Sequence, residues 1–128
     1  MTINTFEELE IWKEARELAK IIRALTKNET FSKDFKLCSQ INSSAGSIMD
    51  NIAEGFERDG HREFVQFLYI AKASNGETRS QAYRAFDAEY IQESEFTEIL
   101  SRTQNLRIKI IALINYLKKS QFKGNKFK

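Results

Sequence analysis

Residues 47–60 read Ser-Ile-Met-Asp-Asn-Ile-Ala-Glu-Gly-Phe-Glu-Arg-Asp-Gly, and they hold both the pattern of a buried helix and the signal that ends it. Ile48, Ile52 and Phe56 are each one helical turn apart, a spacing that places their side chains on one face of an α-helix. The Asp-Gly pair at 59–60 then interrupts the pattern, because this pair favours a turn. The stretch therefore predicts the end of one amphipathic helix and a tight connection to the next.

The same apolar period continues toward the N-terminus and defines two helices. The first begins at Thr5, where Thr5 and Glu8 match a capping box, and it ends in the polar run 27–34. The second begins at Phe35 and reaches the Asp-Gly break. The faces that we expect to be buried are Leu9, Ile11, Ala15, Leu18, Ile22 and Leu25 in the first helix, and Phe35, Cys38, Ile41, Ala45, Ile48, Ile52 and Phe56 in the second.

Two more helices follow the break. The third begins near His61, and after a connection at 88–94 the fourth carries its apolar face from Phe96 to Leu117. Four amphipathic helices joined by short connections must fold back on one another to bury their apolar faces. The sequence therefore predicts an all-α protein: a single-domain antiparallel up-down-up-down four-helix bundle over residues 1–117, with a basic, frayed C-terminal tail at 118–128.

The composition argues against several classes of function. The chain has one cysteine and one histidine, so it cannot form an internal disulfide or the paired Glu-x-x-His motifs of a di-iron bundle. Cys38 and His61 lie on different predicted helices, and there is no glycine-rich phosphate loop. We therefore expect no metal, no cofactor and no enzymatic activity.

Two further features bear on the compartment. The most apolar stretch, 108–117, has only about half the length that a membrane span requires. The N-terminus carries acids where a signal peptide would carry positive charge. We expect a cytoplasmic protein without a membrane partner.

The third and fourth helices carry more apolar surface than one buried face requires. Residues 64–71 and 110–114 are apolar around most of a helical turn, and such a helix has to be covered on both sides. A second copy of the chain is one such cover, which predicts a homo-oligomer. The alternative is that aromatic and alanine side chains thicken a single core.

The charge of the chain is placed unevenly. The net charge is +2, but residues 118–128 hold five lysines and no acid, so contacts with a polyanion have to come from local patches. Cations of the first helix recur at spacings of three and four and fall on one arc, a ridge that fits a phosphate backbone. The residues for which we predict nucleic-acid contacts are Lys13, Arg16, Lys20, Arg23, Lys27, Lys118, Lys119 and Lys123.

The same ridge has a second interpretation. Glu10, Glu14 and Glu17 lie on a neighbouring arc of the first helix, and cations of a solvated helix face often pair with such acids. The lysine tail is likewise an ordinary solubilising terminus in many proteins. Sequence alone leaves both interpretations open.

Polar side chains lie beside the predicted core of the second helix. Asn51 and Glu54 are one turn apart, so we expect them to bridge helices through buried hydrogen bonds that fix register rather than perform chemistry. Gly46 and Gly55 lack a side chain, which predicts the close approach of another backbone. The structural polar layer that we predict comprises Asn51, Glu54, Arg58 and Ser74, and Asn75 and Thr78 of the third helix are candidates to face it as well.

The order of these motifs is that of a known family. Residues 51–56 read Asn-Ile-Ala-Glu-Gly-Phe, and Arg58, Glu63-Phe64 and the run Phe-Leu-Tyr-Ile-Ala at 67–71 follow. With Phe-Glu-Glu-Leu-Glu-Ile-Trp-Lys at 6–13, the chain resembles the four-helix bundle family of 23S rRNA intervening-sequence proteins over nearly its whole length.

The resemblance implies a bundle that assembles into a ring, commonly a pentamer, and that has no enzymatic activity. It also implies partners, because the related accessory proteins of diversity-generating retroelements bind nucleic acid and the reverse transcriptase. The chain departs from the family pattern at Asn42 and Ser43, where members usually have arginines, at 49–50, where a proline is usual, and at Asn75, where an apolar residue is usual. We predict association with structured RNA or other nucleic acid; the alternative is a scaffold that recruits a partner protein without binding nucleic acid.

Overall fold

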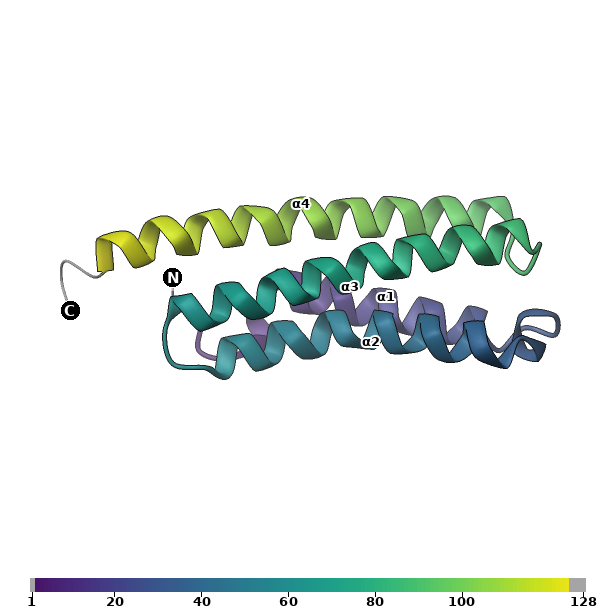
Figure 1. Cartoon of the computed structure of the whole chain (residues 1–128), viewed down its shortest axis with the longest axis horizontal. Coiled ribbons are helices and arrows are strands. Elements are labelled where there is room, and N and C mark those ends of the chain that lie inside the picture. The colour runs from purple at the N-terminus through teal and green to yellow at the C-terminus, as the bar shows by residue number, and fades with distance from the viewer. Residues whose placement is uncertain (1, 125–128) are drawn as a thin grey trace.

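Four α-helices make up most of the computed structural model, which describes residues 2–124 and their side chains as far as Ser120. Successive helices run in opposite directions, so the first helix begins and the fourth helix ends at the same end of the bundle (Figure 1). Residues 2–124 contain no β-strand. The predicted all-α antiparallel four-helix bundle is therefore confirmed, and its helices are α1 (Glu10–Leu25), α2 (Phe35–Glu57), α3 (His61–Asp87) and α4 (Glu93–Gly124).

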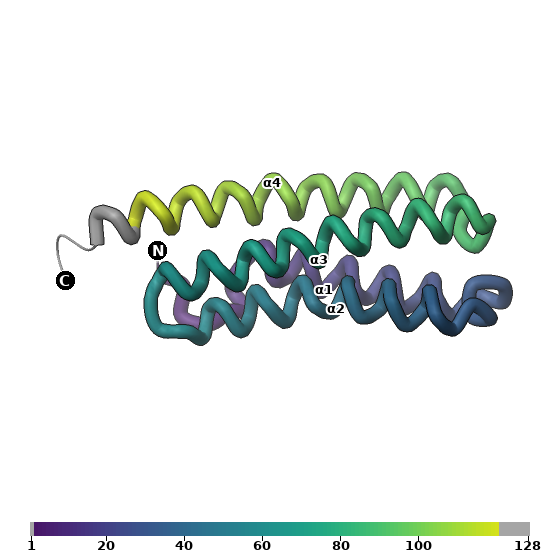
Figure 2. The backbone as a smooth tube through the Cα atoms, in the orientation of Figure 1, coloured from purple at the N-terminus to yellow at the C-terminus, as the bar shows by residue number. Residues whose placement is uncertain are grey.

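The core lies along the axis of the bundle and collects one face from each helix. On α1 the apolar stripe predicted from sequence is inside, because Ile11, Ala15, Leu18 and Ile22 are all buried. Figure 2 shows α2 and α3 following each other closely through the length of the bundle. Burial of these stripes supplies the stabilisation that short helices lack in isolation. The largest fully buried apolar side chains are Phe31, Leu18, Ile22, Ile41, Ile48, Ile52, Leu68, Ile99, Leu106 and Ile110.

The predicted capping pattern at the N-terminus is present, but it starts a different element. The Glu8 carboxylate accepts a hydrogen bond from the backbone N–H of Thr5 at 2.9 Å. The residues between them form a short 3₁₀ turn, Phe6–Glu8, and α1 begins only at Glu10. The cap therefore shapes the entry into the bundle rather than the first turn of α1.

The connection between α1 and α2 differs from the expected polar run. It contains a second 3₁₀ turn, Phe31–Lys33, in which Phe31 is 1% exposed and its ring stacks on that of Tyr90 at 5.1 Å between centroids. Phe35, which we expected on the buried face of α2, is 81% exposed. The prediction for Phe35 is wrong because Phe31 and Leu37 take the apolar positions at this end of the core.

The connection between α2 and α3 is as short as the Asp-Gly pair predicts. Gly60 has φ +94°, a conformation that side chains disfavour. Just before it, Gly55 meets α3 so closely that an added Cβ would lie 2.6 Å from Cβ of Phe67. The predicted close approach is confirmed at Gly55. It is wrong at Gly46, where an added Cβ would meet nothing within 4 Å.

The fourth helix is longer than expected and changes the interpretation of the C-terminus. It has 32 residues, or about 48 Å at 1.5 Å per residue, and Figure 1 shows it extending past the α2–α3 turn. The segment from 118, for which we predicted a frayed tail, continues this helix as far as Gly124. Residues 125–128 lie outside the described residues.

Apolar side chains also reach the surface of α3 and α4. No helix of the described part of the chain has a stretch both long and apolar enough to cross a membrane. Large apolar side chains are instead exposed along the two helices, two of them adjacent within the apolar segment 64–71 and none within 110–114. They are Tyr69 (46% exposed), Ile70 (47%), Tyr83 (46%), Ile108 (53%) and Tyr116 (65%).

Candidate nucleic-acid interface

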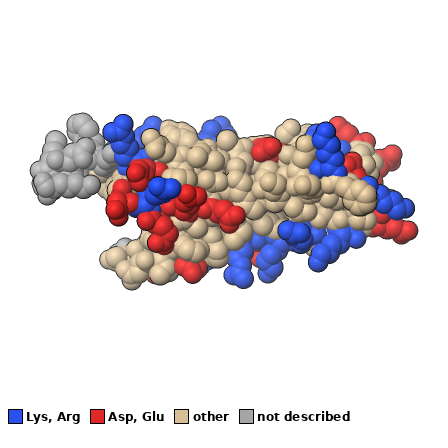
Figure 3. Space-filling model, turned by 60° about the horizontal axis from the view of Figure 1, so that its bottom comes forward, with Lys and Arg blue, Asp and Glu red and all other residues tan. Residues whose placement is uncertain are grey.

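Four of the five ridge cations lie on α1 and all of them are exposed. Lys13, Arg16, Lys20 and Arg23 form one row along this helix, and we call this row the basic track. Lys27 is exposed as well, but α1 ends at Leu25, so Lys27 lies in the turn beyond. Figure 3 shows Lys and Arg side chains in a row along one edge of the underside of the bundle, with a group of Asp and Glu side chains toward the other end.

Ion pairing does little to neutralise the basic track. Lys20 approaches Glu17 at 3.8 Å, with both side chains at least half exposed. Pairs of this kind contribute little to stability and are screened by salt. Among the side chains that the structure describes, Lys13, Arg16 and Arg23 form no ion pair. The guanidinium of Arg16 instead lies 5.8 Å from the centre of the Trp12 ring.

The acids of α1 are occupied on its other side. Nζ of Lys109 on α4 donates to Glu10 at 2.7 Å and to Glu14 at 2.5 Å. The hydrogen bond from Lys109 lowers the pKa of Glu10, and the bonds to the two carboxylates raise the pKa of Lys109. Glu10 and Glu14 therefore join α1 to α4, and among the described side chains they form no ion pair with the basic track.

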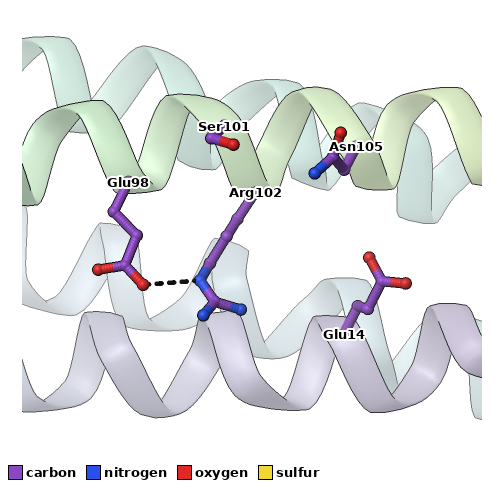
Figure 4. A pocket seen from close by; sticks show the side chains of 5 residues that line it. All are labelled: Glu14, Glu98, Ser101, Arg102 and Asn105. Atoms are coloured by element: carbon purple, nitrogen blue, oxygen red, sulfur yellow. Dashed lines mark hydrogen bonds and ion pairs between the residues drawn. The ribbon is translucent and has the colours of Figure 1, made fainter.

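A polar cleft of about 320 Å³ lies on the same side, between α1 and α4. Figure 4 shows Glu14 reaching into it from α1 and Arg102 from α4, where Arg102 is held by Glu98 at 3.0 Å. Ser101 lines the cleft, but the single histidine of the chain, His61, begins α3 and is not among its lining residues.

The described residues also contain no group of three potential metal-ligating side chains.

A second depression borders the basic track. It is a shallow hollow of about 420 Å³ between α1 and α2. Arg16, Lys20 and Arg23 line it from α1, and Asn42 and Asp50 line it from α2. The remaining lining residues carry no charge; they are Ala19, Gly46 and Met49. This hollow is where cations and groups of α2 could contact one ligand together.

The predicted polar layer exists between α2 and α3, but only two of its four members belong to it. Asn51 donates to the carbonyl of Ser47 at 2.8 Å and to its hydroxyl at 2.9 Å. That hydroxyl also bonds the hydroxyl of Ser74 at 2.9 Å. Asn51 and Ser74 are therefore linked across the interface through Ser47, a residue to which the sequence analysis gave no role.

Glu54 and Arg58 do not bridge helices, and this part of the prediction is wrong. They form an ion pair of 2.9 Å one turn apart on the surface, where their side chains are 53% and 47% exposed. The reason is the rotation of α2, which turns the neighbouring Gly55 toward α3 and leaves position 54 outside.

Two further buried polar clusters contain Thr78 and Asn75, the other residues of α3 that were predicted to face α2. In the first, Ser44 of α2 bonds Thr78 at 2.8 Å and donates to Gln81 at 2.6 Å, both on α3. Ser44 lies one turn before Ile48 on α2. The pair Ser44 and Ser47 on α2 and the pair Ser74 and Thr78 on α3 are each three or four residues apart. That spacing of small hydroxyl residues within apolar stripes was the available signal.

The second cluster joins α3 to α4. Asn75 donates to the carbonyl of Thr103 at 2.8 Å, and Arg79 donates to the Leu100 carbonyl at 2.8 Å and to the Thr103 hydroxyl at 3.0 Å. Asn75 is 2% exposed, and its Oδ1 has no hydrogen-bond partner among the described residues. Asn75 thus contacts α4 and not α2, so the helix predicted as its partner is wrong.

The predicted tail contacts lie apart from the hollow. Nζ of Lys118 donates to the Tyr69 hydroxyl at 2.7 Å and lies 5.1 Å from the centre of its ring. Lys118 is thereby placed against α3, and Lys119 is exposed on α4. The side chain of Lys123 lies outside the described residues. The structure therefore groups the α1 cations with one another and does not group them with Lys118.

Comparison with known proteins identifies the family. A family model described as 23S rRNA-intervening sequence protein matches residues 7–123. The chain belongs to this family. Among solved structures, a protein of unknown function from the S23 ribosomal protein family of Bacteroides thetaiotaomicron is similar, with a TM-score of 0.75 and 25% sequence identity over 81% of this chain and 97% of that one. No curated protein matches the sequence.

The structure shows where the chain departs at two positions from the pattern expected of 23S rRNA-intervening sequence proteins. Asn42 lines the hollow beside the basic track, and the neighbouring Ser43 is exposed on α2. Arginines at these positions would add cations to the same side of the bundle. In this chain, α1 alone supplies the cations of the hollow.

Proposed function

We propose that this 23S rRNA-intervening sequence protein is a non-catalytic, cytoplasmic homo-oligomer that associates with structured RNA or other nucleic acid through the basic track. One observation carries the proposal. Three of the four cations of the track, Lys13, Arg16 and Arg23, form no ion pair among the described side chains, while two of the three acids of that helix are bound to Lys109 of α4.

The physical basis is neutralisation of phosphates. From Lys13 to Arg23 the track is about 15 Å long, at 1.5 Å per residue. Each lysine or arginine that neutralises a phosphate releases condensed counterions, so such a row binds a nucleic-acid backbone without reading its sequence. Only the exposed pair of Lys20 with Glu17 has to be given up among the described side chains of the track, and such a pair contributes little.

Self-assembly is the second part of the proposal. The exposed apolar side chains on α3 and α4, such as Ile70 and Ile108, support it, because a second copy would cover them. We propose a ring, commonly a pentamer in proteins that this chain resembles. Contacts through α3 and α4 leave α1 accessible, so assembly and nucleic-acid binding do not compete for the same face.

The same apolar side chains support a second candidate function. A scaffold that recruits a partner protein through α3 and α4 would use Tyr83 and Tyr116, which are exposed and suited to protein interfaces. Such binding would be nearly indifferent to ionic strength, whereas phosphate binding falls steeply with salt.

A salt series distinguishes these functions. Fluorescence binding of a structured RNA hairpin and a DNA duplex is measured with wild type and with Arg16→Gln/Arg23→Gln. The matched control is Arg62→Gln/Arg107→Gln, which removes the same charge from exposed arginines of α3 and α4. We expect the track variant to lower the slope of log K against log salt by about 1.5–2, and the control to leave it unchanged.

Two results would contradict the proposal. The first is the absence of binding by the wild type even at low salt, which would favour the scaffold function. The second is an equal loss of slope in both double variants, which would mean that net charge and not the track governs binding.

A further inference from the structure

The hollow between α1 and α2 combines groups that a simple phosphate site does not need. Arg16, Lys20 and Arg23 supply the cations. Asp50 contributes an exposed carboxylate from α2, which can only accept hydrogen bonds when ionised. An acceptor among the residues that line a cationic hollow is unfavourable beside phosphate oxygens, unless the ligand also carries a donor.

Asn42 is a second acceptor in the hollow. Its Nδ2 donates to the carbonyl of Cys38 at 2.9 Å and to the hydroxyl of Thr26 at 3.0 Å. A carbonyl only accepts, and the Thr26 hydroxyl already donates to the carbonyl of Arg23 at 2.9 Å, so the amide nitrogen must face these partners. Both amide hydrogens are occupied, and no described residue donates to Oδ1. What Asn42 can offer a ligand is therefore the acceptor Oδ1.

The backbones of RNA and DNA differ in whether they carry a hydrogen-bond donor. The sugar–phosphate backbone of DNA presents acceptors only, whereas each ribose of RNA adds a 2′-hydroxyl that can donate. A hollow with three cations and two acceptors is complementary to a ribose–phosphate unit and is less complementary to its deoxyribose counterpart.

We propose that this hollow is a ribose–phosphate site, in which Arg16, Lys20 and Arg23 bind phosphate and Asn42 Oδ1 accepts a hydrogen bond from a 2′-hydroxyl, so that the protein prefers RNA to DNA. The inference rests on the proposed nucleic-acid function and names the chemical class of its ligand. Asn42 is then a specificity-determining residue, and the cations set affinity without discriminating between the two backbones.

Gly46 is a position at which a larger side chain can be introduced to block the hollow. An added Cβ at this position would meet nothing within 4 Å, although Gly46 lies in the middle of α2. The same holds for Gly76 in the middle of α3, which does not line the hollow. A large side chain at Gly46 therefore occupies the hollow without disturbing a packed interface, and Gly76 provides the matched control.

The first experiment compares three probes of one sequence: an RNA hairpin, the same hairpin with 2′-fluorine in place of each hydroxyl, and the DNA hairpin. The fluorinated probe keeps the phosphates and lacks the donor. We expect wild type to bind the RNA about fivefold more tightly than the fluorinated probe, the worth of roughly one hydrogen bond. The Asn42→Leu variant should bind both with equal affinity.

Asn51→Leu is the matched control for this variant. Asn51 lies on the same helix and likewise donates to the carbonyl four residues earlier and to a hydroxyl, but it does not line the hollow. Its preference for RNA should equal that of wild type. Far-ultraviolet circular dichroism of both variants establishes that they are folded.

A second pair of variants does not depend on the fold tolerating Leu at position 42. Gly46→Leu should weaken RNA binding and abolish the preference over the fluorinated probe, whereas Gly76→Leu should do neither. Equal binding of the RNA and fluorinated probes by wild type, or a preference that survives in Asn42→Leu and Gly46→Leu, would overturn the inference and leave phosphate binding by the track intact. Failure of wild type to bind any probe at low salt would overturn the proposed function and the inference with it.

Discussion

The two sides of α2 make opposite use of similar residues. Toward α3, Ser44 and Asn51 form their hydrogen bonds inside the bundle, and Phe67 packs closely against Gly55. Toward α1, three of the four cations of the basic track form no ion pair among the described side chains, no described residue donates to the oxygen of Asn42, and Gly46 leaves open space. The side of α2 that faces α3 is filled by other residues of the chain, whereas the side that faces α1 keeps polar groups available to a ligand.

The difference shows how to separate stability from function in a small helical protein. A polar group whose partners lie within the fold contributes to stability, and its loss is felt by the whole bundle. A polar group without partners in the protein stays hydrated, so it contributes little to the free energy of unfolding and contributes to affinity once a ligand binds. Substitutions on the α3 side should therefore change unfolding and leave binding unchanged, and substitutions on the α1 side should do the reverse.

Gly55→Ala should produce the largest change on the side of α2 that faces α3. The added Cβ would lie 2.6 Å from Cβ of Phe67, so α2 and α3 must separate. We expect the free energy of unfolding to fall by about 1–3 kcal/mol. Urea denaturation checks this, with Gly46→Ala as the control, which should gain about 0.5–1 kcal/mol from helix propensity. Equal effects of the two substitutions would mean that α3 does not approach α2 at Gly55.

Thr78→Val should have a smaller effect on the same side. It removes a fully buried hydroxyl that lies 2.8 Å from the Ser44 hydroxyl, to which it can donate, and 3.0 Å from the Ser74 carbonyl. Ser44 keeps its bond to Gln81, so we expect a loss of about 1 kcal/mol in urea denaturation. RNA affinity should stay at the wild-type value, and a change in affinity without loss of stability would contradict the division between the two sides.

The cap of α2 should add a dependence on pH. The pKa of Asp34 lies below its ordinary value of 3.8 because its carboxylate accepts hydrogen bonds from the backbone N–H of Leu37 and from the Tyr90 hydroxyl. A lowered pKa means that the ionised form stabilises the fold above the ordinary value, and that this contribution is lost as pH falls through the lowered pKa.

Asp34→Asn tests this contribution, because it keeps a capping oxygen and removes the charge. Its melting temperature should lie below that of wild type at neutral pH, and the gap should narrow as the pH falls below about 4. A gap that is constant from neutral to acidic pH would show that the charge of Asp34 does not stabilise the fold.

Glu54→Ala should have the smallest effect. Its ion pair with Arg58 is formed within one turn of the surface of α2, with both side chains about half exposed. Such pairs contribute less than about 0.5 kcal/mol, so the melting temperature and the oligomeric state should match those of wild type. A loss comparable to that of Thr78→Val would restore Glu54 to the polar layer.

The sequence predicted the fold well because its signals are local. Apolar residues at helical spacing, such as Ile11 and Ile52, were buried as expected, and the pair Asp59-Gly60 ended α2. Phe31 was missed because it stands alone in a polar run, and its burial depends on the ring of Tyr90 far along the chain. Periodicity carries no information about such a distant partner.

The candidate site was predicted less completely. The spacing of the α1 cations placed them on one face, since helical geometry alone decides this. It did not reveal that Lys109 on α4 would bind Glu10 and Glu14, nor that the outward rotation of Glu54 would exclude it from the polar layer. The hollow beside Asn42 depends on how α1 packs on α2, which is a tertiary property.

Lysine footprinting tests the central claim most directly, because it reports which side chains the RNA covers. The protein, with and without a structured RNA hairpin, is acylated at low salt, and the labelling rate of each lysine is read by mass spectrometry. Lys13 and Lys20 of the basic track should be protected by RNA, while Lys72 on α3 reacts at its original rate. Unchanged rates at Lys13 and Lys20 with RNA bound, or protection of Lys72 in their place, would contradict the assignment of the α1 face as the RNA-binding surface.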